Sequence, residues 1–422
     1  MFEKIKSIYN KSNYDISSEF VNPLDYHKTF YFILKQFRVV DVDSSKNKYC
    51  NQNIILFTIG AIANTLMLIS LCHGIHKMEI PHITEAGTYC IVLSYKLLIL
   101  SCTKINVVHY ENLLKSMKED FKYIFTNGKK YRERFFGLQL VTWKISLFSV
   151  IFTFSIPVGM IISAFGSLLY YLLTNESRNG NKRPLLFPFY IHGVDFGDTP
   201  IYEIAFTFSN ICTLAYAYNY IFMIQTQIVW VRQITSKADI IIWNLQDLLR
   251  DIYPPTNETQ RAYFLNLIKH RMRDIVRQHQ SMYSLMEDYS QVYKKLLLFE
   301  QKCCGPVVCL TAYCATEKLA EGELNVVLIL LCVGTIVMHY IPSHLCTFLT
   351  IKVRSICDAC WDTPFWNADK AIRPYIVLIM QRSLRPLPLR AAGFEDICIQ
   401  TFSRKMTSAY SYFNMLRQAN RK

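Results

Sequence analysis

The chain has 422 residues, of which 51% are hydrophobic, 14% are aromatic and only 18% are charged. So few charged side chains cannot cover an ordinary soluble surface, so the composition favours an integral membrane protein. The net charge of +14 does not indicate nucleic-acid binding, because the basic residues are spread over several segments. Residues 1–10 lack the apolar core of a cleavable signal peptide, so we expect the first apolar segment to direct membrane insertion.

Seven segments have the length of about 20 residues that a helix needs to cross a bilayer. Six are clearly apolar and the last is marginal; they are 54–72, 87–108, 141–173, 201–230, 296–316, 324–350 and 395–418. No internal repeat or Gly/Ser-rich linker divides the chain. The sequence therefore predicts an all-α, seven-transmembrane protein that forms a single domain.

Lysine and arginine collect in the connections that follow the second, fourth and sixth spans. Such basic connections face the cytoplasm, which also places the amino terminus there. This orientation argues against a G-protein-coupled receptor, whose seven helices begin outside the cell. The predicted parts are a cytoplasmic region 1–53, spans one to four in 54–230, a cytoplasmic helical connection 231–295, spans five and six in 296–350, a cytoplasmic anchor 351–394 and a last helix 395–422.

The stretch from about 260 to 300 has apolar residues at helical spacing and predicts an amphipathic cytoplasmic helix that runs into the fifth span. These residues are Leu265, Ile268, Met272, Ile275, His279, Met282 and Met286.

The last segment carries two faces when residues 395–418 are placed on a helix of about 3.6 residues per turn. The apolar face consists of Ile399, Phe402, Met406, Tyr410, Phe413 and Leu416. The polar face consists of Ser403, Thr407, Ser411, Asn414 and Gln418. From the residues alone, such a polar face forms either interhelical hydrogen bonds or the wall of a water-filled path.

Residues 393–417, GFEDICIQTFSRKMTSAYSYFNMLR, resemble the terminal signature of insect odorant receptors, in which Thr-Phe precedes a Tyr-Ser-Tyr-Phe run. The similarity extends upstream, in order, over the second half of the chain. It includes Trp361, Trp366, IMQRSLRPLPL at 379–389, FPFYI at 187–191, PIYEI at 200–204 and RQHQ at 277–280.

The resemblance implies an odour-gated, non-selective cation channel of four subunits in the plasma membrane of a sensory neuron dendrite. It implies that the last helix of each subunit lines a central pore, here with Thr407, Ser411, Met415, Gln418 and Ala419. Met415 and Ala419 depart from the aliphatic residues usual at the constriction. The implied partners are the odorant co-receptor, a small volatile ligand and the lipid bilayer, without nucleic acid.

Two related kinds of receptor and one other class of membrane protein are the alternatives to this interpretation. Gustatory receptors of the same superfamily carry Thr-Tyr, five apolar residues and Gln-Phe, whereas Ser408 and Ala409 occupy the last two places here. The co-receptor has a long cytoplasmic insert between spans four and five, whereas about 65 residues join them here, so a ligand-tuning subunit is preferred. A polytopic transporter or membrane enzyme is the alternative class.

The resemblance also implies a ligand pocket in the outer half of the bundle, formed by spans two, three, four and six with help from five. A volatile ligand gains affinity there mainly by burying apolar area. For each candidate, ordinary helix packing is the competing interpretation. The candidates are Tyr89, Val92, Tyr95, Ser155, Gly159, Ile162, Ser163, Phe206, Ser209, Asn210, Tyr313, Ile329, Val333 and Ile336.

Other chemistry-bearing residues give weaker signals. Cys357 and Cys360 form a single C-x-x-C without a second pair, so we expect neither metal nor cofactor. Glu300 and His339 are ionisable residues within predicted spans, where such residues often have a function, although both can also reach the inner interface or pair locally. Asn175 is the one glycosylation sequon that this topology places outside the cell.

Overall fold

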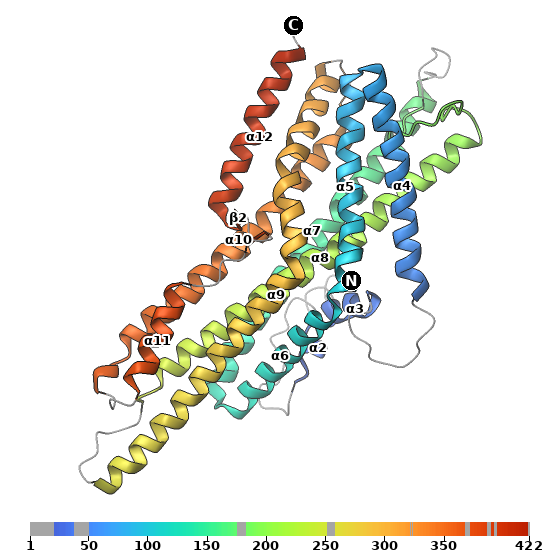
Figure 1. The fold of residues 1–422 in the computed structure, drawn as a ribbon. Coiled ribbons are helices and arrows are strands. Elements are labelled where there is room, and N and C mark those ends of the chain that lie inside the picture. The colour runs from blue at the N-terminus through green and yellow to red at the C-terminus, as the bar shows by residue number, and fades with distance from the viewer. Residues whose placement is uncertain are drawn as a thin grey trace.

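The structure is a computed structural model, and it describes residues 21–37, 50–174, 183–250, 258–320, 322, 324–367, 372–385, 390–391 and 395–420. The described chain is almost entirely helical, as the composition and periodicity predict (Figure 1). The predicted glycosylation site Asn175 lies outside the described residues. A two-stranded antiparallel sheet, β1 (Arg390–Ala391) and β2 (Glu395–Asp396), is the small non-helical addition.

Four described helices are long and apolar enough to cross a membrane on length and composition alone. They are α4 (Cys50–Lys77), α5 (Ile80–Ile105), α7 (Lys129–Leu173) and α10 (Val326–Asp362). The other three predicted spans lie in α8 (Ile201–Gln246), α9 (Glu258–Ala320) and α12 (Ile399–Asn420). These three contain more polar residues. Neighbouring helices bury many of those of α8, whereas α12 carries an exposed polar face.

The helices gather into two parts that share α7, α8, α9 and α10 (Figure 1). The upper part also contains α4, α5 and α12. The lower part contains α6 (Val107–Thr126), α11 (Arg373–Leu384) and the lower ends of the shared helices, and we call it the anchor. The short helices α2 (Pro23–Tyr26) and α3 (Lys28–Gln36) pack near its upper end, and a 3₁₀ turn, η3 (Phe365–Asn367), precedes α11.

The centre of the anchor is the lower half of α8, where every residue from Asn219 to Ile241 is buried. A helix buried on all sides must satisfy each polar group inside the protein. Lys237 meets Asp120 of α6 at 2.7 Å, and Asp239 meets Lys352 of α10 at 2.5 Å. Charged pairs and buried amides such as Gln233 therefore lie where α8 contacts its neighbours, beside apolar side chains.

The structure corrects one predicted segment and confirms another. The second span was expected at 87–108, but α5 ends at Ile105 and a separate helix, α6, begins at Val107. Asn106 lies at the junction, where its side-chain amide donates to the carbonyl of Val292 on α9 at 3.4 Å. The amphipathic helix expected at 260–300 is confirmed, because α9 runs without a break from Glu258 to Ala320.

Candidate functional site

A cavity of about 100 Å³ lies among α5, α7, α8, α9 and α10. One water molecule needs roughly 10–15 Å³ measured in the same way, so the cavity has room for a small organic molecule. The residues around it are Tyr89, Ile91, Val92, Leu93, Tyr95, Thr153, Ile156, Pro157, Met160, Phe187, Thr213, Tyr216, Ala217, Tyr220, Phe299, Glu300, Cys303, Val307, Leu331, Gly334, Thr335, Met338 and His339.

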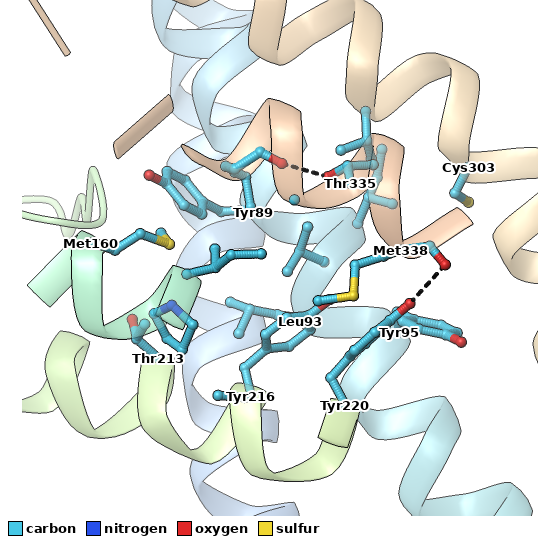
Figure 2. A pocket seen from close by; sticks show the side chains of 18 of the residues that line it. Tyr89, Leu93, Tyr95, Met160, Thr213, Tyr216, Tyr220, Cys303, Thr335 and Met338 are labelled. Carbon is cyan, nitrogen blue, oxygen red and sulfur yellow. Dashed lines mark hydrogen bonds between the residues drawn. The ribbon is translucent and has the colours of Figure 1, made fainter. Parts of the chain in front are cut away.

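Aromatic rings form much of the wall. Tyr95 stacks on Phe299 at 5.3 Å between ring centroids, and Tyr216 stacks on Tyr220 at 6.0 Å. Figure 2 shows Tyr95, Tyr216 and Tyr220 on one side of the cavity and Tyr89 and Met160 on another. Most of the wall can thus contact an apolar ligand by dispersion and burial of area.

The segment between α7 and α8 contributes Phe187, whose ring meets Tyr89 edge-on at 4.8 Å. Its position is fixed by the next residue, because the Ser70 hydroxyl of α4 donates to the carbonyl of Pro188 at 2.5 Å. The ring of Tyr190 stacks on that of His73, which also belongs to α4, with 3.4 Å between the ring centroids. The connecting segment is therefore fastened to the end of α4 and closes part of the cavity.

Few polar groups of the wall are available to a ligand. Thr213 and Thr335 donate to carbonyls of their own helices, at 3.0 and 2.7 Å. His339 contacts the carbonyl of Thr335 through Nδ1 at 2.7 Å. Tyr95 donates to Oε1 of Glu300 at 2.5 Å, and none of the described residues donates to the other carboxylate oxygen. Glu300 is therefore the strongest acceptor in an otherwise apolar wall.

The structure brings three of the fourteen predicted ligand-contact residues, Tyr89, Val92 and Tyr95, to the cavity wall. The other eleven lie elsewhere on the same helices. On α7, Ser155 and Ile162 are exposed, Ser163 is half-buried, and Gly159 faces Leu330 of α10.

The remaining seven residues pack within or outside the bundle. Phe206 meets Phe165 edge-on at 5.1 Å, and Ser209 and Asn210 hydrogen-bond to carbonyls of their own helix. Tyr313 belongs to a small cluster with Leu328, next to α12. Ile329 and Val333 are exposed, and Ile336 is half-buried. Tyr216, Tyr220 and Thr335 also line the cavity, although the sequence gives no signal for them. Glu300 and His339 line it too, and the sequence singles them out as ionisable residues within predicted spans.

The last helix, α12, shows a polar face that no described residue covers. Thr407, Ser411, Met415 and Gln418 are exposed along it, and Ala419 follows in the last turn. The hydroxyls of Thr407 and Ser411 donate to carbonyls one turn earlier, both at 3.1 Å, so their oxygens can still accept hydrogen bonds. On the opposite side, Phe413 and Leu416 pack against the cluster that contains Tyr313.

The described residues contain no site for a metal ion, since no three His, Cys, Asp or Glu side chains come together among them. The described residues thus form a mainly apolar cavity with one carboxylate, and a separate helix, α12, with an exposed polar face.

Known proteins are similar to this chain in sequence and in architecture. The family described as 7tm Odorant receptor matches residues 83–410. Odorant receptor 49a of Drosophila melanogaster is 24% identical over 238 residues, which is 53% of this chain and 57% of that protein. Odorant receptor 85f of the same species is 26% identical over 160 residues, covering 36% and 40% of the two chains. The matches therefore span about half the length of these relatives or less.

The fold is similar to that of the insect olfactory receptor OR5 from Machilis hrabei, with a TM-score of 0.67 and 16% sequence identity over 94% of this chain and 100% of that one. A second structure of that receptor, in complex with eugenol, matches equally well. The likeness shows a seven-transmembrane receptor fold, and the family consists of receptors, not enzymes. With a family match over more than three quarters of its length, the chain belongs to the 7tm odorant receptor family.

Proposed function

We propose that this odorant receptor subunit binds a small volatile ligand in the cavity and opens a non-selective cation channel. In this proposal it acts as a ligand-tuning subunit, together with the odorant co-receptor, in the plasma membrane of a sensory neuron dendrite. The single observation that carries the proposal is the mainly apolar cavity between α5, α7, α8, α9 and α10.

The cavity suits such a ligand because most of its wall is apolar and aromatic. Burying apolar area contributes about 25 cal/mol per Å², and a few polar groups then fix the ligand's orientation. The Machilis receptor that shares this fold has been solved in complex with eugenol. That precedent supports a small organic ligand for this fold.

The conduction path is proposed along the polar face of α12, with Thr407, Ser411, Met415, Gln418 and Ala419. Hydroxyls and amides exposed along a membrane helix are costly in lipid, so water or another protein chain is the suitable neighbour. Four copies of this face around a common axis would enclose a water-filled path.

Helix α9 contacts both the cavity and α12. Phe299, Glu300, Cys303 and Val307 of α9 line the cavity, and α12 packs on the same helix. A ligand favours the open channel only to the extent that it binds that state more tightly. The shared helix gives a direct route by which a ligand-dependent shift of the cavity wall can reach α12.

Whole-cell current under an odour panel tests the proposal, with the chain expressed alone and together with an insect odorant co-receptor. Odour-evoked cation current only when both chains are present is the expected result. Absence of current in both cases, with surface delivery of both chains confirmed by labelling, would contradict the proposed function.

A further inference from the structure

The most unusual group in the cavity is the carboxylate of Glu300. Glu300 is only 2% exposed, and Tyr95 is the one described residue that donates to its carboxylate. None of the ion pairs formed among the described residues includes it. A buried carboxylate without a cation is costly, because hydrogen bonds from one neutral hydroxyl do not replace its lost hydration.

The cavity that contains Glu300 is lined by aromatic rings, which can bind a cation on their faces. Tyr95, Tyr216, Tyr220 and Phe299 line the same cavity, and their π faces carry negative electrostatic potential. Tyr95 and Tyr220 lie 6.1 Å apart between centroids, at an angle of 55°, so they form two differently oriented walls. Aromatic walls with one carboxylate are a recurrent arrangement for recognising ammonium groups.

We propose that the cavity takes a small amine, held as its ammonium form by Glu300 and by the surrounding tyrosine rings. The inference rests on the proposed function and names its ligand class. The free oxygen of Glu300 accepts from the ammonium, and the carbon skeleton of the ligand lies against the apolar wall. The ion pair is the same whether the ammonium arrives charged or a neutral amine takes the proton of a protonated Glu300.

Three probes of nearly equal size separate this idea from simple hydrophobic binding: 2-phenylethylamine, 2-phenylethanol and propylbenzene. The first readout is the shift in melting temperature of the purified full chain with its co-receptor, and the second is odour-evoked current. We expect the amine to bind at least about tenfold more tightly than propylbenzene, as a charge-assisted hydrogen bond in a buried site implies.

Two variants assign the effect to the carboxylate. Glu300→Gln keeps the shape of the side chain and an acceptor for Tyr95, but it removes the charge. We expect it to weaken binding of the amine about tenfold or more, and that of the alcohol less than threefold. Tyr95→Phe keeps the ring and releases the second carboxylate oxygen, so amine binding should be retained.

Each outcome decides between the two proposals. Equal affinity for amine and hydrocarbon in the native chain, or equal weakening of all three probes by Glu300→Gln, overturns the amine site and leaves the proposed function standing. Amine stabilisation that depends on Glu300, without current under any probe or odour, supports the amine site and contradicts ligand gating. The retained binding of 2-phenylethanol shows that the Glu300→Gln protein is folded.

Discussion

Lys405 of α12 donates from its Nζ to both the backbone carbonyl and the side-chain oxygen of Gln301 on α9, at 2.8 and 2.6 Å. The same ammonium pairs with Glu395 at 2.7 Å. Gln301 directly follows Glu300, whose side chain reaches the cavity. The helix proposed to line the pore is therefore fastened to the cavity wall one residue from the strongest polar group in it.

Replacing Lys405 with glutamine should change gating more than ligand binding. The variant loses the charge that holds three acceptors, so the contact between α9 and α12 weakens by roughly 1–3 kcal/mol. We expect the maximal current, or the ligand concentration for half-maximal current, to change at least threefold at unchanged surface delivery. Arg404→Gln is the matched control, because Arg404 is exposed and donates its hydrogen bond to Thr401 of its own helix.

Filling the cavity should abolish ligand responses without preventing folding. Val92→Phe adds a ring at the cavity wall, and the extra volume occupies the space that a ligand needs. We expect at least a tenfold rise in the ligand concentration for half-maximal current. Val141→Phe on α7, where the side chain is 45% exposed, adds the same volume outside the cavity and should leave the response unchanged. Equal loss in both variants would argue for misfolding instead.

The polar face of α12 predicts a test of ion permeation. Ser411→Lys places a cation on that face, so it should reduce cation current by repulsion and shift the reversal potential toward anion permeability. Tyr412→Lys introduces the same charge about 100° around the helix, on an equally exposed position away from the proposed path. Identical permeation in the native and Ser411→Lys channels would mean that this face contacts protein and not ions.

The sequence predicts the helices of this fold well, because hydropathy and basic connections report on contact with lipid and water. Its failure at 87–108 has a local cause. The apolar pattern continues past Ile105, but the contact of Asn106 with Val292 lets the chain turn into α6, and this tertiary contact cannot be seen in the pattern. The long α9 was predictable because Ile268, Met272 and Ile275 recur on one face and are all buried.

The cavity was much less predictable, since periodicity shows which residues face the core but not where two neighbouring helices stand apart. Tyr313 faces inward as expected, yet it packs against Leu328 near α12 and not against the cavity. Val333 and Gly334 are adjacent in sequence, but only Gly334 reaches the cavity wall. A Cβ atom added at Gly334 would lie 3.1 Å from the side chain of Ile156. Glu300 and His339 could be singled out from the sequence, because an ionisable residue within an apolar span is unusual whatever the packing around it.

The buried ion pair in the anchor should be essential for stability. Asp120 and Lys237 are each 2% exposed in their side chains, and Gln233 also donates to Asp120 at 2.9 Å. Asp120→Asn leaves the ammonium of Lys237 buried without a counter-charge, which costs about 3–5 kcal/mol. We expect a marked fall in melting temperature and in surface delivery. Glu133→Gln is the control, because its partner Lys129 is 80% exposed and such pairs contribute little.

A pH dependence of stability follows from His279, on the part of α9 that belongs to the anchor. Burial, with a smaller contribution from Arg382, lowers the pKa of His279 to about 4. Its ring lies against Tyr283 and 3.4 Å from the hydroxyl of Ser383, so this histidine holds α11 on α9 in its neutral form. In the unfolded chain the pKa is about 6.5, so the unfolded state takes up a proton first as the pH falls.

The stabilisation is therefore fully present above about pH 6.5 and is lost progressively as the pH falls toward 4. At pH 5 the difference amounts to about 2 kcal/mol, which should lower the melting temperature of the purified complex relative to pH 7.5. His279→Gln should remove this part of the pH dependence, whereas His270→Gln, at a side chain that is 72% exposed, should preserve it. If both variants keep the full dependence on pH, other groups in the anchor carry it, and the neutral His279 contact is not what acid releases.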